Sequence, residues 1–144
     1  MTDDPNREAA AIRDARAAQT AALAREDVEA VAAFWTADVT IRRALGHAID
    51  GALAARKAFD RAPNAPNPLV YRRVSTRVDV SAAWPLAFEE GDWAGHLGDA
   101  AGPAIIGGRY AAQWVKRDGR WLIRSEVFVA LHCTEVGRGL AALP

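Results

Sequence analysis

Cysteine is nearly absent from this chain, and so are long apolar runs. Cys133 is the only cysteine among 144 residues, so no internal disulfide can form, and no second thiol is present for a metal or redox pair. We expect Cys133 to be a small buried apolar residue. No apolar run approaches the ~20 residues that cross a bilayer, and residues 1–14 hold no apolar segment of a secretory signal. The sequence therefore predicts a cytoplasmic protein that does not bind membranes.

An excess of charge of either sign is also lacking. The 18 basic and 18 acidic residues give a formal net charge of zero, whereas a nucleic-acid-binding protein needs a basic excess on one face. We therefore expect no nucleic-acid partner. The composition, 51% hydrophobic and 25% charged, is typical of a globular protein. The length suits a single domain over residues 1–144, with an ordered core at about residues 5–133.

The first part of the chain has the pattern of helices. A capping acid followed by Pro5 starts a helix that continues to about Arg25. Its inward stripe has i, i+3, i+4 spacing and consists of Ile12, Ala15, Gln19 and Leu23. Gln19 is the one polar member, either on a partly exposed side of the helix or as an amide facing a cavity. Asp27 can cap a second helix over residues 28–35.

Strands follow these helices. Residues 39–43 alternate as in a strand, residues 48–51 form a short return strand, and a third helix covers residues 52 to about 61. The Pro-rich residues 62–68 form a surface loop. Four long strands then cover residues 69–80, 84–95, 105–117 and 120–132, and the tail from residue 137 is predicted to be loose.

Only one face of each long strand is apolar, so the helices must cover one face of the sheet. On the first long strand, that core face carries Val70, Arg72, Val74, Thr76, Val78 and Val80. Segregated helices and a meander of long strands predict an α+β fold.

Several short segments resemble the nuclear-transport-factor-2-like superfamily, which includes SnoaL-type polyketide cyclases and ketosteroid isomerases. They are residues 25–31 (REDVEAV), 34–41 (FWTADVTI), 49–51 (IDG), 108–110 (GRY) and 114–123 (WVKRDGRWLI). The resemblance implies a cone-shaped, curved antiparallel sheet with three N-terminal helices packed on its concave face. It also implies a cavity between the two and frequent homodimers through the sheet. It does not imply one chemistry.

The groups that catalyse steroid isomerisation are missing. The resemblance places the catalytic Asp of those enzymes on Arg43, whose guanidinium stays protonated and cannot act as a base. The Tyr and the Asp of their oxyanion hole fall near Gln19 and Ala112. Steroid-isomerase chemistry is therefore not expected.

The turn at Asp118-Gly119 decides which side chains of the last hairpin face the cone. A two-residue turn places Tyr110 opposite Val127, whereas a three-residue turn that includes Arg117 places Tyr110 opposite Glu126. A slip of one residue moves every side chain to the other face. The family comparison favours the three-residue turn. The residues that then converge are Tyr110, Trp114, Arg124, Glu126 and Phe128, together with Arg43, Arg72 and Trp35.

These residues suggest two kinds of site. In the first, Glu126 is a general acid or base, Tyr110 and Arg43 donate hydrogen bonds to developing negative charge, and His47 lies near the cavity mouth. In the second, Glu126 belongs to a solvated or dimer-interface ion network with Arg124 and Arg109.

The predicted ligand-binding residues are mainly aromatic and basic. They are Trp35, Arg72, Trp93, Trp114, Arg124 and Phe128, whereas Trp84 and Trp121 are expected to be structural. The three histidines have no metal-ligand spacing, so neither a metal nor another cofactor is expected.

The leading hypothesis is a cone cavity that binds a small, largely hydrophobic molecule, with cofactor-free isomerase, cyclase or dehydratase chemistry. The alternative is a non-catalytic ligand-binding or dimeric interaction domain. An enclosed pocket with a polar end favours the first, and a cavity filled by Trp and Leu favours the second.

Overall fold

One curved sheet of six strands organises the chain. The computed structural model describes residues 4–59 and 69–141, without the side chains of residues 140 and 141. The helices are α1 (Pro5–Ala24), α2 (Val28–Ala32), α3 (Ala52–Phe59) and α4 (Glu135–Ala141). The strands are β1 (Trp35–Arg42), β2 (Ile49–Asp50), β3 (Leu69–Val80), β4 (Leu86–Leu97), β5 (Ala104–Arg117) and β6 (Arg120–Cys133).

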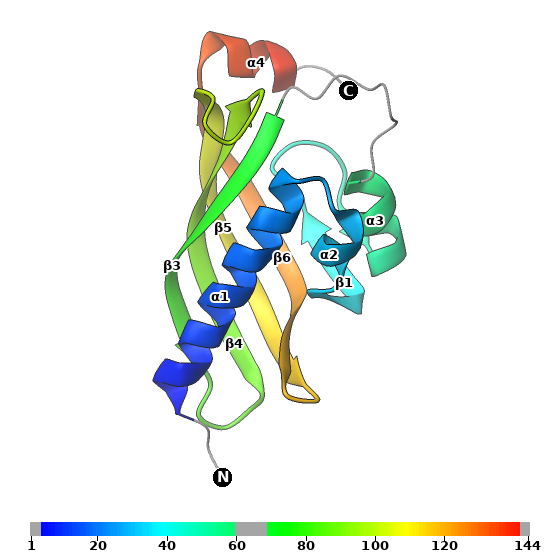
Figure 1. Cartoon of the computed structure of the whole chain (residues 1–144), viewed down its shortest axis with the longest axis vertical. Coiled ribbons are helices and arrows are strands. Elements are labelled where there is room, and N and C mark those ends of the chain that lie inside the picture. The colour runs from blue at the N-terminus through cyan, green and yellow to red at the C-terminus, as the bar shows by residue number, and fades with distance from the viewer. Residues whose placement is uncertain (1–3, 60–68, 142–144) are drawn as a thin grey trace.

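The strand order is β2-β1-β6-β5-β4-β3, and only the β1–β6 pair is parallel. α1 runs across one face of the sheet over β3, and α2 and α3 lie beside β1 (Figure 1). The predicted α+β class, with three N-terminal helices on one face of a curved sheet, is confirmed. None of the helices in the described ranges is long and apolar enough to cross a membrane.

The predicted helix starts are also confirmed. The Asp4 carboxylate accepts a hydrogen bond from the Asn6 amide at 3.0 Å, and Asp27 accepts one from the Ala30 amide at 3.1 Å. α2 is shorter than predicted, because Trp35 already pairs with Ile123 in the parallel β1–β6 ladder. Strand pairing overrides helix propensity at this point.

Two other expectations about local structure are wrong. Residues 137–141 of the predicted loose tail belong to α4, whose start is fixed by a hydrogen bond from the Gly137 amide to the Thr134 hydroxyl at 3.2 Å. Cys133 is exposed rather than buried. Trp84, expected to be structural, is 69% exposed between β3 and β4. The Pro-rich loop at residues 62–68 and the last two residues of the third predicted helix lie outside the described residues.

A β-bulge in β3 changes which residues face the helices. The pairing with β4 shifts between Ser75 and Arg77, so the inward face differs before and after that point. Before the bulge Arg73 is buried and Arg72 is exposed, so the predicted core-face position of Arg72 is wrong. After the bulge Val78 and Val80 pack against the core, as predicted.

The β5–β6 hairpin has a two-residue turn, so the favoured three-residue register is wrong. Asp118 and Gly119 both have positive φ, of 51° and 77°, which is the type I′ geometry, and Arg117 pairs with Arg120. Asn, Asp and Gly are the residues that tolerate this conformation.

A second bulge then reverses the faces of β6. Trp114 pairs with Ile123 but Gln113 pairs with Ser125, which leaves Arg124 as the extra residue. Glu126 therefore faces inward and is buried, although the turn alone would have pointed it outward. Arg124 is exposed, so its predicted position inside the cone is wrong.

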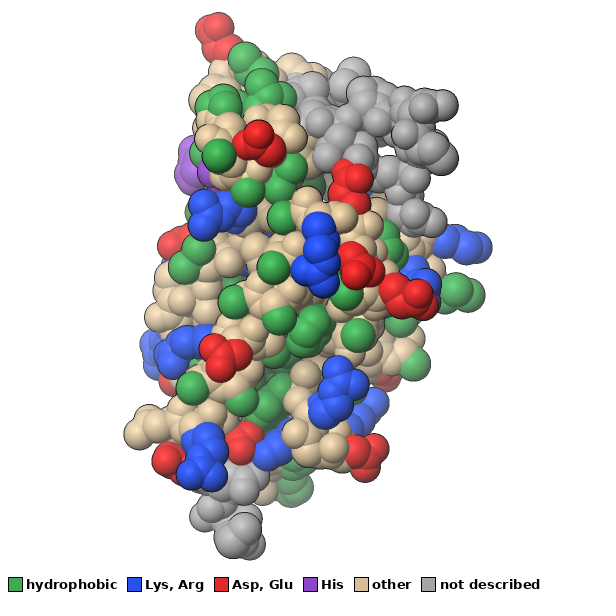
Figure 2. Space-filling view, in the orientation of Figure 1, with side chains coloured by type: hydrophobic (Ala, Val, Ile, Leu, Met, Phe, Trp, Pro, Cys, Tyr) green, Lys and Arg blue, Asp and Glu red, His purple; other side chains and the backbone are tan. Residues whose placement is uncertain are grey.

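The core fills the space between the helices and the sheet. Ile12 from α1, Val31 from α2, Ile41 from β1, Trp114 from β5 and Ile123 from β6 are fully buried there. Figure 2 shows hydrophobic side chains in the seam beside α1, with basic and acidic side chains interspersed over the helices. This face therefore carries no basic patch.

Candidate functional site

A pocket of about 350 Å³ lies between the C-terminal end of α1, α2, α3 and the sheet. Most of the described lining is apolar, and the charged residues among the described lining are Glu26, Arg43 and Arg73. Glu26 and Arg43 are exposed, whereas Arg73 is only 7% exposed. The pocket therefore has an open mouth with charges of both signs and a buried part with a positive charge.

Aromatic side chains form the sheet side of the pocket. The rings of Trp93 and Phe128 lie 6.5 Å apart with an edge contact at 81°, and Tyr71 lies 6.0 Å from Trp93. The Trp93 indole N–H donates to the Val129 carbonyl oxygen at 3.0 Å, which fixes its ring. An aromatic wall of this kind suits a flat apolar molecule.

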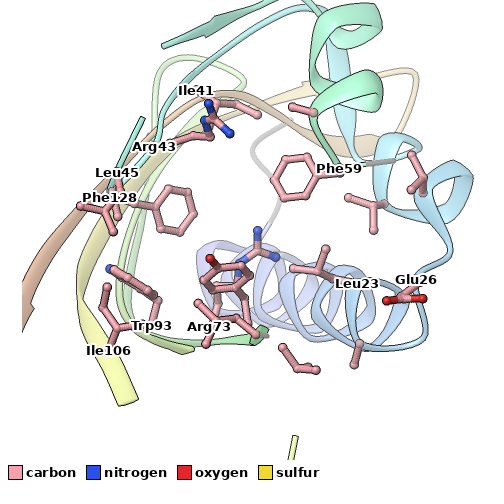
Figure 3. Close-up of a pocket in the computed structure, with 18 residues that line it drawn as sticks. Leu23, Glu26, Ile41, Arg43, Leu45, Phe59, Arg73, Trp93, Ile106 and Phe128 are labelled. Atoms are coloured by element: carbon pink, nitrogen blue, oxygen red, sulfur yellow. The ribbon is translucent and has the colours of Figure 1, made fainter. Parts of the chain in front are cut away.

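Arg73 is the buried polar group of the pocket. Its guanidinium extends between Trp93 and Phe128 on the sheet side and Leu23 and Phe59 on the helix side (Figure 3). The guanidinium carbon lies 5.5 Å from the centre of the Phe128 ring. Arg73 Nη1 is buried and has no hydrogen-bond partner within the described ranges. Burial lowers the pKa of Arg73 to about 10, although the negative charge of Glu126 partly opposes this effect.

A second buried arginine, Arg16 on α1, is fully paired. Its Nε lies 3.1 and 3.2 Å from the two carboxylate oxygens of Glu89, and its Nη2 donates to Glu89 Oε1 at 2.9 Å. Glu89 also accepts hydrogen bonds from the Tyr110 hydroxyl at 2.6 Å and from the Trp114 indole N–H at 2.8 Å. Burial alone would lower the pKa of Arg16, but the carboxylates of Glu126 and Glu89 outweigh burial and raise it.

Glu126 lies beside this pair but is bonded differently. Arg16 Nη1 is 3.0 Å from Glu126 Oε2, yet the same nitrogen donates its hydrogen bond to the Gln19 side chain at 2.9 Å. Neither carboxylate oxygen of Glu126 accepts a hydrogen bond from any residue that the structure describes. Glu126 is therefore held by charge alone, with its lone pairs free. Gln19 is fully buried, so it does not lie on a partly exposed side of α1, and it is not among the described residues that line the pocket.

Tyr110 does not have a free hydroxyl. Burial raises the pKa of Tyr110, and the negative charge of Glu89 raises it further. Its proton therefore stays on the phenol and is used in the hydrogen bond to Glu89. The ring of Tyr110 stacks on Phe128 at 5.3 Å, so it supports the pocket wall from behind.

The structure brings some of the predicted site residues together. Arg43, Trp93 and Phe128 line the pocket, and Glu126 and Tyr110 are buried next to it. Arg72 and Arg124 are exposed on the opposite face of the sheet.

The other predicted site residues do not line the pocket. His47 is exposed, and its carbonyl oxygen accepts a hydrogen bond from Arg43 Nε at 3.0 Å. Trp35 packs on Phe59 in the core with ring centres 5.5 Å apart, and Trp114 is bonded to Glu89.

The sequence analysis missed Arg16, Glu89 and Arg73. Arg16 lies four residues after Ile12 and three before Gln19, so helical spacing alone places it on the inward stripe. Glu89 alternates with Ala87, Gly91 and Trp93, which gives it the inward position of β4. The described part of the chain contains no group of three or more His, Cys, Asp or Glu residues that could hold a metal ion.

A family model described as "SnoaL-like domain" matches residues 7–126. The chain belongs to the SnoaL-like domain family. No match to this SnoaL-like domain is found among curated protein sequences.

Solved structures share its fold at low sequence identity. An NTF2-like protein of unknown function from Pseudomonas putida is 17% identical, with 95% of this chain and 94% of that chain covered, and a TM-score of 0.74. A hexachlorocyclohexane dehydrochlorinase is 20% identical, with 90% and 88% covered and a TM-score of 0.67. A ketosteroid isomerase-like protein from Erwinia carotovora atroseptica is 20% identical, with 88% and 98% covered and a TM-score of 0.66. These similarities place the chain in the expected nuclear-transport-factor-2-like fold.

Proposed function

We propose that this SnoaL-like domain binds a small, largely apolar molecule and catalyses cofactor-free acid–base chemistry of the isomerase or lyase type. One observation carries the proposal. Beside an apolar pocket, Arg73 has a buried N–H without an acceptor, and Glu126 has two buried carboxylate oxygens without a donor. Buried polar groups are normally satisfied, and exceptions of this kind need an explanation. A bound ligand would supply the missing partners.

The two unsatisfied groups have complementary roles. Arg73 is already removed from water, so it would stabilise negative charge that develops on a ligand oxygen without reorganising. Glu126 would carry the proton, as acid or base, directly or through one water molecule. Arg73 takes over the donor role that the sequence suggested for Tyr110, because the Tyr110 hydroxyl already donates to Glu89. Arg43 would contact the ligand at the mouth of the pocket.

The comparisons support this type of chemistry. Two of the similar structures are named as a dehydrochlorinase and as a ketosteroid isomerase-like protein. Dehydrochlorination is by name an elimination of hydrogen chloride, in which a proton leaves carbon. We carry only this general reaction type to the SnoaL-like domain, since the identities are 20%.

A simple proton transfer tests the proposal. The neutral ketone 2-tetralone has acidic C–H groups, and their exchange with D₂O is measured by proton NMR. The protein is expected to accelerate this exchange above the buffer rate. Glu126→Gln is expected to return it to the buffer rate, because the amide cannot take the proton. Ala44→Trp is expected to do the same, because Ala44 lines the pocket and the indole would fill it.

Two variants on exposed positions are the controls. Glu29→Gln and Ala11→Trp change the same residue types at exposed sites and should leave the exchange rate unchanged. An exchange rate in Glu126→Gln equal to that of the unmodified protein would show that Glu126 carries no proton.

A homodimer through the sheet is a second proposal, carried by a different observation. β6 exposes Val127, Val129 and Leu131 on the face opposite the helices, and Val74 and Phe88 are exposed on β3 and β4. Exposed apolar side chains along neighbouring strands are typical of an interaction surface. We expect light scattering at several concentrations to give the mass of two chains, and Val129→Asp to shift it toward one. A single-chain mass at every concentration would exclude the dimer.

A further inference from the structure

Two buried arginines face the interior, and only one has a carboxylate partner. Arg16 makes a bidentate pair with Glu89, whereas Arg73 forms no ion pair with any residue in the described ranges. We propose that the pocket is a carboxylate site: it takes a flat apolar body whose carboxylate lies on Arg73, and Glu126 takes up a proton when this anion binds. The inference rests on the proposed function, because it uses the same pocket.

The chemistry of Arg73 points to a carboxylate. The planar guanidinium presents a fork of N–H groups that matches two carboxylate oxygens, and hydrogen bonds between charged groups are roughly twice as strong as neutral ones. Arg73 is already buried in the folded protein, so ligand binding does not have to offset the desolvation of its guanidinium. Among the residues that the structure describes, the remaining buried lining of the pocket is apolar and offers no competing donor of similar strength.

The shape of the lining defines the rest of the ligand. Trp93 and Phe128 form one wall, and Leu23 and Phe59 lie across the pocket from them (Figure 3). A volume of about 350 Å³ is at the lower end of the range for small-molecule pockets. A ligand with one or two fused rings and a single carboxylate fits both the apolar walls and the volume of the pocket.

The buried charges explain the uptake of a proton. Glu126 on β6, Glu89 on β4 and Tyr110 on β5 are the described acidic groups that act electrostatically on both Arg16 on α1 and Arg73 on β3. With both Glu residues ionised and Tyr110 neutral, two positive charges balance two negative charges. A ligand carboxylate adds a third negative charge, and a buried charge without a counter-charge is costly.

Of the two buried glutamates, Glu126 is the one that we expect to take up the proton. Glu89 accepts hydrogen bonds from Arg16, Tyr110 and Trp114, all of which favour its ionised form, whereas the Glu126 oxygens accept none from the described residues. The proton comes from solvent, and no covalent bond forms or breaks. The resulting state has an anionic ligand oxygen on Arg73 and the proton on Glu126. It has the same charges as the state reached when a ligand C–H passes its proton to Glu126.

The experiment compares two probes of nearly identical shape. The neutral fluorescent compound N-phenyl-1-naphthylamine reports occupancy of the pocket, and 2-naphthoate and 2-acetylnaphthalene compete with it near pH 7. We expect 2-naphthoate to compete at a concentration at least about tenfold lower, since a hydrogen bond to a charged partner is worth more than a neutral one. Arg73→Met should remove this difference, and the matched control Arg72→Met, an exposed arginine one position away, should retain it.

Calorimetry in two buffers tests the proton. Binding enthalpies of 2-naphthoate in phosphate and in Tris should differ by an amount that corresponds to uptake of close to one proton. Glu126→Gln should abolish the difference and should bind 2-naphthoate more tightly, because the negative neighbour of the ligand is gone.

Each contrary result overturns a defined part of the account. Equal competition by the ketone and the carboxylate, or binding of 2-naphthoate without dependence on the buffer, would overturn the carboxylate site while the pocket function stands. Both comparisons use the unmodified protein, so they test the carboxylate site even if a variant does not fold. Failure of the reporter and of both probes to bind would overturn the proposed pocket function itself, and the carboxylate site with it.

Discussion

Replacing Arg16 by leucine is expected to lower the free energy of unfolding by about 3–5 kcal/mol, because it leaves buried carboxylates without their partner. Arg16 is the counter-ion of both Glu89 and Glu126, and all three side chains are at most 1% exposed. The loss is measured by urea denaturation near pH 7, followed by tryptophan fluorescence and circular dichroism.

Arg13→Leu is the matched control for this variant. Arg13 lies on α1 three residues before Arg16 but is exposed, so its replacement should change the free energy of unfolding by less than about 0.5 kcal/mol. If Arg16→Leu were no more destabilising than Arg13→Leu, the buried charge network would not stabilise the fold.

The other buried arginine should behave in the opposite way. Replacing Arg73 by methionine is expected to raise the free energy of unfolding by about 2 kcal/mol near pH 7, since an apolar side chain of similar length removes a buried charge that makes no ion pair with the described residues. The gain is limited because Glu126 loses a favourable positive neighbour. Arg72→Met, on the exposed face, should have little effect. A side chain that costs stability yet faces a pocket is typical of a functional site.

The pH dependence of this gain follows from the lowered pKa of Arg73. Below about pH 10 Arg73 is charged in both the folded and the unfolded chain, so its full cost is present. Above about pH 10 the unfolded chain holds more protons than the folded one, and the stability of the unmodified protein recovers. The difference between the two proteins should therefore shrink above pH 10. A destabilising Arg73→Met, or a difference that grows with pH, would contradict the description of Arg73 as a costly buried charge without an ion pair.

The helices and the α+β class could be predicted because their signals are local. Asp4 with Pro5 and Asp27 mark helix starts through contacts within three residues, and each behaves as the sequence indicates. The arrangement of the sheet was predicted from the short segments that resemble the nuclear-transport-factor-2-like superfamily. The end of α2 was harder to predict, because the partner of Trp35 is Ile123, far along the chain.

The two bulges explain most of the errors in the site. A single extra residue leaves no mark on an alternating pattern, yet it moves the following side chains to the other face. The bulge after Ser75 puts Arg73 rather than Arg72 in the pocket, and the two-residue turn exposes Arg124 because it places Ile123 on the inward face. Glu126 was placed on the inward face correctly only because two shifts of one residue add up to two, which restores the same face. The shorter turn moves the residue opposite Tyr110 from Glu126 to Val127, and the bulge moves it on to Phe128.

The charge network could not be predicted as a network. Arg16 and Glu89 are 73 positions apart, and nothing in either local pattern identifies the other as its partner. Spacing places each on an inward face, where an isolated charge would be costly. Because an isolated buried charge is costly, inward-facing charges of opposite sign on different elements can be expected to form ion pairs with one another.

The crystal structure of the protein with 2-naphthoate tests the central claim most directly. We expect the carboxylate oxygens to lie about 2.7–2.9 Å from the Arg73 guanidinium nitrogens. The naphthalene rings should lie against Trp93 and Phe128. A ligand with its carboxylate at the mouth beside Arg43 and with Arg73 left without an acceptor would contradict the account, as would a pocket without ligand.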